Sequence, residues 1–474
     1  MFSTRSVLSL PGRGARLAAA TLVSALAAAG VAAGAGTATA QDTAGRHAER
    51  GDGGATATIG GLKTYGTAVI HGPEGDQEVA AGLFEMSVEG GGTLHTYCVD
   101  IETPTQKDAK YAETPWSGTS LHVNKDAGRI RWILQNSYPQ VNDLAALAKK
   151  AGIKGGLTEQ DAAAGTQVAI WRYSDHADVE AVEPRAERLA DYLEKNARDL
   201  DEPAASLTLD PPAVSGHPGE RIGPVTVHTN AAGATVIPPA DAVASEVRVV
   251  DKDGKPVTSV RDGAQLYFEV PEDAADGTAG LTVQASTSVP VGRAFASESR
   301  SQTQILAGSS ESTVSAAATA LWAGTGPIPA LSGTKNCTDG GLDITTDNKG
   351  DEPFTFEALG TEYVVPAGGS NTVTVPLPED RAYDLTVRGP AGLEQRFNGV
   401  LDCETRTATA VTGPQTLSGP APAVPVADTT PDPNLAATGS SDATPLIGGT
   451  AIGLVVIGGA VLIAARRREE RDQS

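Results

Sequence analysis

The sequence contains little cysteine, few aromatic residues and less positive than negative charge. Three of its 474 residues are cysteine, 4% are aromatic, and 36 lysines and arginines stand against 58 acidic residues, a formal net charge of −22. Three cysteines are too few for a disulfide-dense scaffold, and pairing two of them leaves one thiol over. The scarcity of aromatic side chains favours several modest cores over one large core. The charge argues against nucleic-acid binding, which needs a basic surface.

Glycine and proline are abundant instead. The chain has 54 glycines and 30 prolines, more than an average globular protein of this length would contain. This composition indicates modest domains joined by turn-rich segments, and the length allows about three such domains.

The N-terminal segment has the pattern of a secretory signal peptide. Residues 1–40 contain three arginines, then an apolar stretch over residues 17–33, and they end on the small-residue sequence Ala-Thr-Ala. A signal peptidase prefers such a site. We therefore expect residues 1–40 to be removed on export and residues 41–59 to form a flexible N-terminus.

A long apolar run lies near the C-terminus. Residues 446–465 carry no charge and are followed at once by three arginines. At 1.5 Å per residue, a helix of this length crosses about 30 Å of hydrocarbon. The arginines predict that the tail is cytoplasmic and that the rest of the chain lies outside the cell.

A short motif precedes this run. It consists of Leu435, Ala436, Ala437, Thr438 and Gly439. Followed by an apolar stretch and a basic tail, it resembles the LPXTG-like sorting signal of Gram-positive surface proteins, in the LAXTG variant. The resemblance implies that a sortase cuts between Thr438 and Gly439 and joins Thr438 to peptidoglycan. Residues 435–474 would then be a sorting signal whose hydrophobic helix is in the membrane only transiently; the alternative is a retained single-pass anchor.

Residues 411–434 are rich in proline and show no apolar periodicity. Such a composition favours extended polyproline geometry. We expect this segment to be a linker that lifts the folded part of the chain through the cell wall.

Two regions have the pattern of all-β domains. Short alternating strands bounded by turn residues recur over residues 206–315 and again over residues 325–410, which predicts two Ig-like β-sandwiches. Cys337 and Cys403 bracket the second region. We expect them to form a disulfide, which on the chain-entropy model would contribute about 4 kcal/mol for a loop of this length.

The region of residues 60–205 has a different pattern, in which strands are followed by helices. Strands are expected at residues 83–88 and 93–101, joined in a hairpin about the glycines at 90–92, with Cys98 in the second strand. Helices are expected from near residue 126. The helix from Thr158 starts with a capping-box-like sequence and carries Gln167 on its apolar face. This order predicts an α+β domain with a β-sheet body and a helical subdomain. Taken singly, Cys98 is typical of a small buried apolar residue and Gln167 of a core amide bonded to backbone.

Together these two residues carry a more specific resemblance. Residues 166–169 match the TQXA motif, and Tyr97, Cys98 and Val99 resemble the cysteine segment of the thioester-domain family of Gram-positive surface proteins. The resemblance implies that the Cys98 sulfur and the Gln167 side-chain carbonyl form an internal thioester with loss of ammonia. A lysine amine of an unidentified partner would then be captured covalently once, without enzymatic turnover. Such a bond must be kept from water, and we expect Tyr97, Trp132 and Trp171 to do so.

Two other functions remain open at this point. A cysteine hydrolase would need a histidine within hydrogen-bond reach of Cys98. His95 has the wrong parity on the strand, which leaves His122 or His176. A passive wall-coat protein would need no bond chemistry. The seven histidines show no metal-ligand spacing, so we expect no metal and no cofactor.

Overall fold

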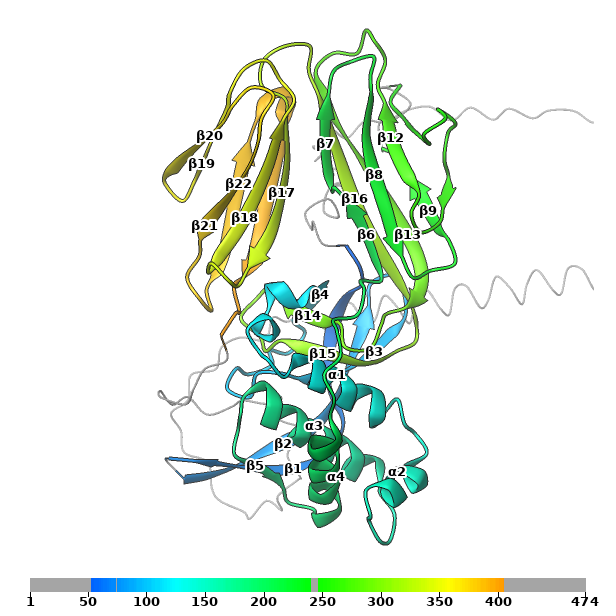
Figure 1. The fold of residues 1–474 in the computed structure, drawn as a ribbon, viewed down its shortest axis with the longest axis vertical. Coiled ribbons are helices and arrows are strands. Elements are labelled where there is room, and N and C mark those ends of the chain that lie inside the picture. The colour runs from blue at the N-terminus through cyan, green and yellow to red at the C-terminus, as the bar shows by residue number, and fades with distance from the viewer. Residues whose placement is uncertain (1–52, 74, 240–245, 405–474) are drawn as a thin grey trace, which may run out of the picture. The chain divides into compact units, whose positions relative to one another are not determined.

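The computed structural model describes residues 53–73, 75–239 and 246–404 (Figure 1). All of them fall in the compact unit Met1–Gly419. The predicted signal peptide, the Pro-rich linker, the sorting motif and the C-terminal hydrophobic helix lie outside the described residues. Within the described ranges, no helix is both long and apolar enough to cross a membrane.

The first domain is built on a sheet whose strands come from separate parts of the chain. Over the described residues this sheet has seven strands, in the order β2-β3-β15-β14-β4-β1-β5. Their bounds are Thr56–Gly72 (β1), Gly75–Val88 (β2), Thr93–Cys98 (β3), Lys110–Thr114 (β4), Val179–Ala181 (β5), Ala294–Ser297 (β14) and Gln304–Ser309 (β15). The long antiparallel β1–β2 hairpin extends from Ala57 opposite Val88 to Gly72 opposite Gly75, with two register shifts between Ile59 and Thr64. The β2–β3 hairpin is the one that the sequence predicts around residues 90–92.

Helices pack on this sheet. In the described part of the chain they are Ala127–Asn136 (α1), Leu144–Lys150 (α2), Glu159–Ser174 (α3) and Pro184–Asn196 (α4), with short 3₁₀ turns at Trp116–Gly118 (η1) and Ser120–His122 (η2). The predicted capping box is present: the Thr158 side chain accepts from the Asp161 N–H, and Asp161 accepts from the Thr158 N–H. Helix α3 lies against β1, β2 and α4 (Figure 1). Gly165 allows the close contact with α4, because a Cβ there would meet the Ala186 carbonyl oxygen.

The second domain consists of two further sheets. Their orders over the described residues are β10-β12-β8-β6 and β11-β9-β13-β16-β7. The strands are Leu207–Asp210 (β6), Ala213–Gly216 (β7), Arg221–Thr229 (β8), Ala234–Ile237 (β9), Arg248–Val250 (β10), Ser259–Val260 (β11), Gln265–Glu269 (β12), Gly277–Ser288 (β13) and Glu311–Trp322 (β16). Val227, Phe268 and Val283 are among the fully buried residues of this all-β region. An immunoglobulin-like topology stays a prediction.

The range 206–315, predicted as one sandwich, differs from the observed arrangement. Strands β14 and β15 fall within that range but pair with β4 and β3 of the first sheet. The sandwich then resumes in β16 and continues to Trp322. Local patterning identifies strands but not their partners, and here the partners lie about two hundred residues away along the chain.

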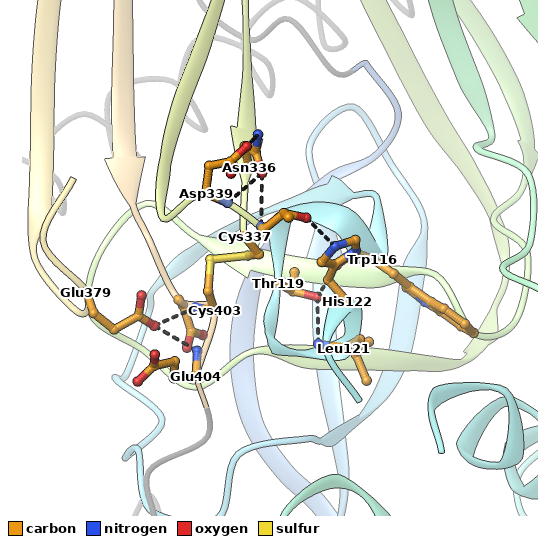
Figure 2. Close-up of a disulfide and its surroundings, with 12 residues drawn as sticks. Trp116, Thr119, Leu121, His122, Asn336, Cys337, Asp339, Glu379, Cys403 and Glu404 are labelled. Atoms are coloured by element: carbon orange, nitrogen blue, oxygen red, sulfur yellow. Dashed lines mark hydrogen bonds between the residues drawn. A yellow bond between two sulfur atoms is a disulfide. The ribbon is translucent and has the colours of Figure 1, made fainter. Parts of the chain in front are cut away.

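The third region contains a three-stranded sheet and two hairpins within the described residues. Its strands are Pro329–Asn336 (β17), Gly341–Asn348 (β18), Phe354–Ala358 (β19), Thr361–Val365 (β20), Ser370–Pro376 (β21), Ala382–Arg388 (β22) and Glu394–Val400 (β23), with a 3₁₀ turn at Pro390–Gly392 (η3). Strand β18 pairs with β17 and β21, β19 with β20, and β22 with β23. The predicted disulfide between Cys337 and Cys403 is present and joins the end of β17 to the segment after β23 (Figure 2).

A buried ion pair ties the first domain to the second. Glu113 on β4 is almost fully buried and accepts from Arg293 Nε at 3.0 Å. The same carboxylate accepts from the Ser206 N–H at 2.9 Å, just before β6. Arg293 also contacts Glu202 at 2.6 Å. This cluster therefore fixes the segment that leads to β14 against the start of the sandwich.

Candidate functional site

Cys98 and Gln167 meet between the first sheet and its helices. Cys98 is the last residue of β3, and Gln167 lies in the middle of α3; their exposed fractions are 2% and 0%. Because the other two cysteines are bonded to each other, Cys98 is the free thiol. The two side chains come from residues 69 positions apart, so only the packing of α3 on the sheet brings them together.

The Gln167 side chain is held by the main chain of Cys98. The Cys98 N–H donates to Gln167 Oε1 at 3.0 Å, and Gln167 Nε2 donates to the Cys98 carbonyl oxygen at 2.9 Å. These two bonds fix the plane of the amide and polarise its carbonyl toward the Cys98 N–H. They also give the buried amide the hydrogen-bond partners that it needs, as expected for a core glutamine bonded to the main chain. The two bonds thus hold the Gln167 amide at the main chain of Cys98.

The sulfur has two polar partners, one near in the chain and one distant. Gln304 Nε2 on β15 donates to Cys98 Sγ at 3.1 Å, and the Thr105 hydroxyl lies 3.9 Å from the same sulfur. Thr105 in turn donates to Gln302 Oε1 at 2.8 Å. Sequence reasoning missed both glutamines. The signal in the sequence was two glutamines just before the apolar stretch of residues 305–307, but nothing local indicated that they face Cys98.

Burial controls the protonation of Cys98. Removal of the thiol from water raises its pKa to about 12, the hydrogen bond from Gln304 and the contact with Thr105 lower it, and the nearby Asp100 and Asp175 carboxylates raise it. The thiol is therefore protonated at neutral pH. Hydrolytic cysteines are instead found as accessible thiolates in electropositive surroundings.

The histidines do not supply the missing base. His122 Nε2 pairs with the Thr338 hydroxyl at 2.8 Å, and His95 Nε2 lies 3.7 Å from a Glu85 carboxylate oxygen. His176 is exposed. Over the described residues none of the three hydrogen-bonds to Cys98 Sγ, so this arrangement does not favour a cysteine hydrolase.

The predicted shielding aromatics differ in burial. Tyr97 is fully buried and donates from its hydroxyl to the Tyr138 carbonyl oxygen at 2.8 Å. Trp171 is 2% exposed, one helical turn after Gln167. Trp132 is only partly buried. Tyr97 and Trp171 are thus buried and Trp132 is less so; that these side chains keep water from the bond stays a prediction.

An acidic cluster lies beside the disulfide. Glu379, Asp380 and Asp402 each place one carboxylate oxygen within 4.8 Å of the others, a spacing that could suit a hard cation. Protein donors already use these oxygens: Glu379 Oε1 accepts from the N–H groups of Cys403 and Glu404 at 2.5 and 2.9 Å (Figure 2), and Asp402 Oδ2 accepts from the Thr303 hydroxyl at 2.6 Å. Acidic residues alone do not define a metal site, so none is assigned here.

Asp402 is expected to make the stability of the protein depend on pH. Burial, and then the neighbouring Asp100, raise its pKa to about 7, from about 3.9 in an unfolded chain. Folding therefore favours the protonated carboxyl. Its contribution to stability is complete below about pH 4 and is lost as the pH rises through about 7. Asp402→Asn should raise the melting temperature at about pH 8 and change it little at about pH 4.

The control for this prediction is Asp384, an exposed carboxylate whose pKa is lowered by its hydrogen bonds to Arg396. Asp384→Asn should lower the melting temperature slightly at about pH 8, the opposite sign. Calorimetry of the three proteins over this pH range measures the effect. Equal pH dependence in the wild type and in Asp402→Asn would contradict the assignment.

Comparisons with known proteins agree with part of this description. Residues 95–199, which contain Cys98 and Gln167, match the family described as thioester domain, and residues 318–400 match the family described as bacterial phospholipase C, C-terminal domain. The first match confirms the resemblance to thioester domains for that region of the chain. The second falls on the third region, for which sequence reasoning proposed only a β-sandwich.

Similar solved structures were also found. The Bacillus anthracis TIE protein is 13% identical, with 73% of this chain and 80% of that chain covered and a TM-score of 0.27. The thioester domain of the Enterococcus faecium TIE86 protein is 16% identical, with 57% and 96% covered and a TM-score of 0.27. The E. coli chaperone DraB is 14% identical, with 41% and 98% covered and a TM-score of 0.15. TM-scores this low carry no conclusion about function. No curated protein matches the chain.

Proposed function

We propose that this chain is a cell-wall-anchored, adhesin-like surface protein that captures an amine-bearing ligand through an internal thioester between Cys98 and Gln167. The observation that carries the proposal is the pair of hydrogen bonds that holds the Gln167 amide on the main chain of Cys98, in a buried site beside the free thiol. The match of residues 95–199 to thioester domains supports it.

Formation of the bond needs only groups that are in the site. Cys98 Sγ attacks the Gln167 side-chain carbon, the thiol proton passes to the amide nitrogen, and ammonia leaves. The Cys98 N–H, which already donates to Oε1, stabilises the negative charge that develops on that oxygen. An amide is a poor electrophile, but well-oriented intramolecular groups reach effective molarities of about 10⁵–10⁸ M. The fold therefore supplies the activation.

In the capture reaction a nitrogen atom attacks and the Cys98 sulfur leaves, the reverse of bond formation. A lysine amine of the ligand attacks the Gln167 carbonyl carbon, the carbon–sulfur bond breaks, and the proton from the attacking nitrogen passes to sulfur. The products are an amide between the two proteins and a free Cys98 thiol. Water would open the same bond without capture, so the near-complete burial of Cys98 and Gln167 preserves it.

The sequence supplies the remaining parts of the proposal. The segments predicted to be a signal peptide (1–40), a wall-spanning linker (411–434) and a sorting signal (435–474) would export the chain and attach it to peptidoglycan through Thr438. The range 41–59, predicted as a flexible N-terminus, reaches too far, because residues 56–59 belong to β1. The intervening ranges, a thioester domain over 60–205 and β-domains over 206–315 and 325–410, would present the thioester outside the wall, with strands β14 and β15 assigned to the first domain.

Intact-mass analysis of the purified chain tests this function. The wild type should be lighter by one ammonia than its sequence requires, and treatment with methylamine should add one methylamine. Cys98→Ala should show neither change, because no sulfur is present to form the bond. A wild-type chain with its full mass that takes up no methylamine would instead favour a passive wall-coat protein.

A further inference from the structure

We propose that Gln304 is the hydrogen-bond donor that stabilises the Cys98 sulfur as a leaving group, and that it thereby sets the rate at which an amine opens the thioester. The inference rests on the proposed function and adds a residue to it. Gln304 belongs to β15, outside the residues 95–199 that match thioester domains.

The sheet register fixes the position of Gln304. Strands β3 and β15 are antiparallel, and Gln304 lies directly opposite Cys98. Side chains of directly opposed residues lie on the same face of a sheet. The Gln304 amide therefore reaches the sulfur without help from a loop, and its Nε2 lies 3.1 Å from Sγ.

A second hydrogen bond fixes which end of the amide faces the sulfur. Thr96, two residues before Cys98 and on the same face of β3, donates from its hydroxyl to Gln304 Oε1 at 2.9 Å. This leaves Nε2 turned toward Sγ. Thr96 and Gln304 are fully buried, so water does not compete for either group.

The donor matters most when the carbon–sulfur bond breaks. Negative charge then develops on a sulfur that is buried and has acidic neighbours, Asp100 and Asp175. Over the described residues, the other polar side chain at the sulfur is Thr105, whose hydroxyl hydrogen is directed at Gln302 Oε1. Thr105 is thus arranged to accept from the Cys98 S–H after the sulfur has taken its proton. Gln304 is the side chain that can donate to the sulfur before that.

The size of the effect follows from the charge. A hydrogen bond to a charged group is worth more than one to a neutral group, and its loss in the transition state should slow the reaction about 10- to 100-fold. Before attack the sulfur is neutral, so the same change should affect the closed thioester much less. We therefore predict that a variant without the Gln304 donor still carries the thioester but opens it more slowly.

The experiment uses the full-length chain and hydroxylamine, a nucleophile much less basic than a lysine amine. Because its neutral fraction still changes with pH, each rate is compared with that of the wild type at the same pH. The intact mass shows which fraction of the chains is lighter by one ammonia and therefore carries the thioester. Opening is followed as the increase in mass when one hydroxylamine is added. Gln304→Leu should carry the thioester and open about 10- to 100-fold more slowly than the wild type. Thr303→Val is the matched control: it removes a buried hydrogen bond at the neighbouring residue without touching the sulfur, and it should open at the wild-type rate.

The pH dependence of opening in Gln304→Glu distinguishes a role at the sulfur from a purely structural role of Gln304. Its carboxyl can donate to sulfur when protonated, but the carboxylate cannot and would repel the developing charge. The opening rate relative to the wild type should therefore fall as the pH rises from about 6 to about 8, whereas the ratio for Gln304→Leu should stay constant. If Gln304→Leu carries no thioester, the Gln304→Glu series decides, with Thr96→Val as a further variant expected to open slowly.

The outcomes separate the two proposals. Opening of the variants at the wild-type rate, with no pH trend for Gln304→Glu, would overturn the role of Gln304 and leave the thioester intact. A third outcome is that Thr303→Val carries the thioester but neither Gln304→Glu nor Thr96→Val does. Gln304 would then be needed to form the bond, and its proposed role in opening the bond would be overturned. A wild-type chain without a thioester would overturn the proposed function itself.

Discussion

Replacing Gln167 with glutamate is expected to abolish the thioester and all covalent capture while leaving Cys98 as a free thiol. A carboxylate at this position is not electrophilic and has no ammonia to release. It also loses the donor that Gln167 Nε2 supplies to the Cys98 carbonyl oxygen, so two buried oxygens would face each other at a cost of about 1–3 kcal/mol. In denaturant at mildly acidic pH, a maleimide should label one thiol in Gln167→Glu and none in the wild type.

The matched control is Gln160→Glu, the same change at an exposed position on the same helix. This variant should still be lighter by one ammonia than its sequence requires, and it should take up methylamine. Maleimide should label no thiol before methylamine has opened the thioester. Because Cys337 and Cys403 are bonded, the labelled residue in Gln167→Glu must be Cys98. An unlabelled Gln167→Glu, or one that still gains methylamine, would show that another group closes the bond.

Replacing Arg293 with methionine is expected to cause a large loss of stability. Arg293 is 5% exposed, and its Nε donates to the buried Glu113 at 3.0 Å. Without the arginine, the Glu113 carboxylate would keep hydrogen bonds from the Ser206 and Ala55 N–H groups but would have no opposing charge. Removing one partner of a buried ion pair costs about 3–5 kcal/mol. Chemical denaturation should show this decrease.

An exposed pair provides the comparison for this prediction. Arg388 and Glu394 form an ion pair at 3.2 Å with exposed fractions of 76% and 58%, and pairs of this kind contribute about 0–1 kcal/mol. Arg388→Met should therefore be nearly neutral. Changing Glu113 to glutamine in the Arg293→Met background should recover part of the loss, since it removes the unpaired charge. Equal effects of the two arginine substitutions would contradict the role of the buried pair.

The sequence predicts the local elements of the site well. The capping box at Thr158 begins α3 where expected, because its signal lies within four residues. The hairpin before Cys98 follows from its alternating strands and three glycines. Strand β1 was missed, since glycines interrupt its alternation, although it forms the longest strand pair of the first sheet.

What the sequence cannot supply is pairing across long separations. Gln304 lies 206 residues from Cys98, and no local pattern distinguishes a strand of the sandwich from one that returns to the first sheet. The range 206–315 was therefore assigned to one domain although β14 and β15 belong to another. The pairing of Cys98 with Gln167 was reached through a family resemblance, since a lone buried cysteine and a lone buried glutamine are ordinary core residues.

Peptide mapping of the wild-type chain tests the thioester most directly. Digestion at acidic pH, where the bond is stable, followed by mass spectrometry should yield a peptide containing Cys98 joined to one containing Gln167. The joined pair should weigh one ammonia less than the two peptides together, and it should separate after hydroxylamine treatment. Recovery of both peptides unjoined, with a free thiol on one and an intact amide on the other, would contradict the account.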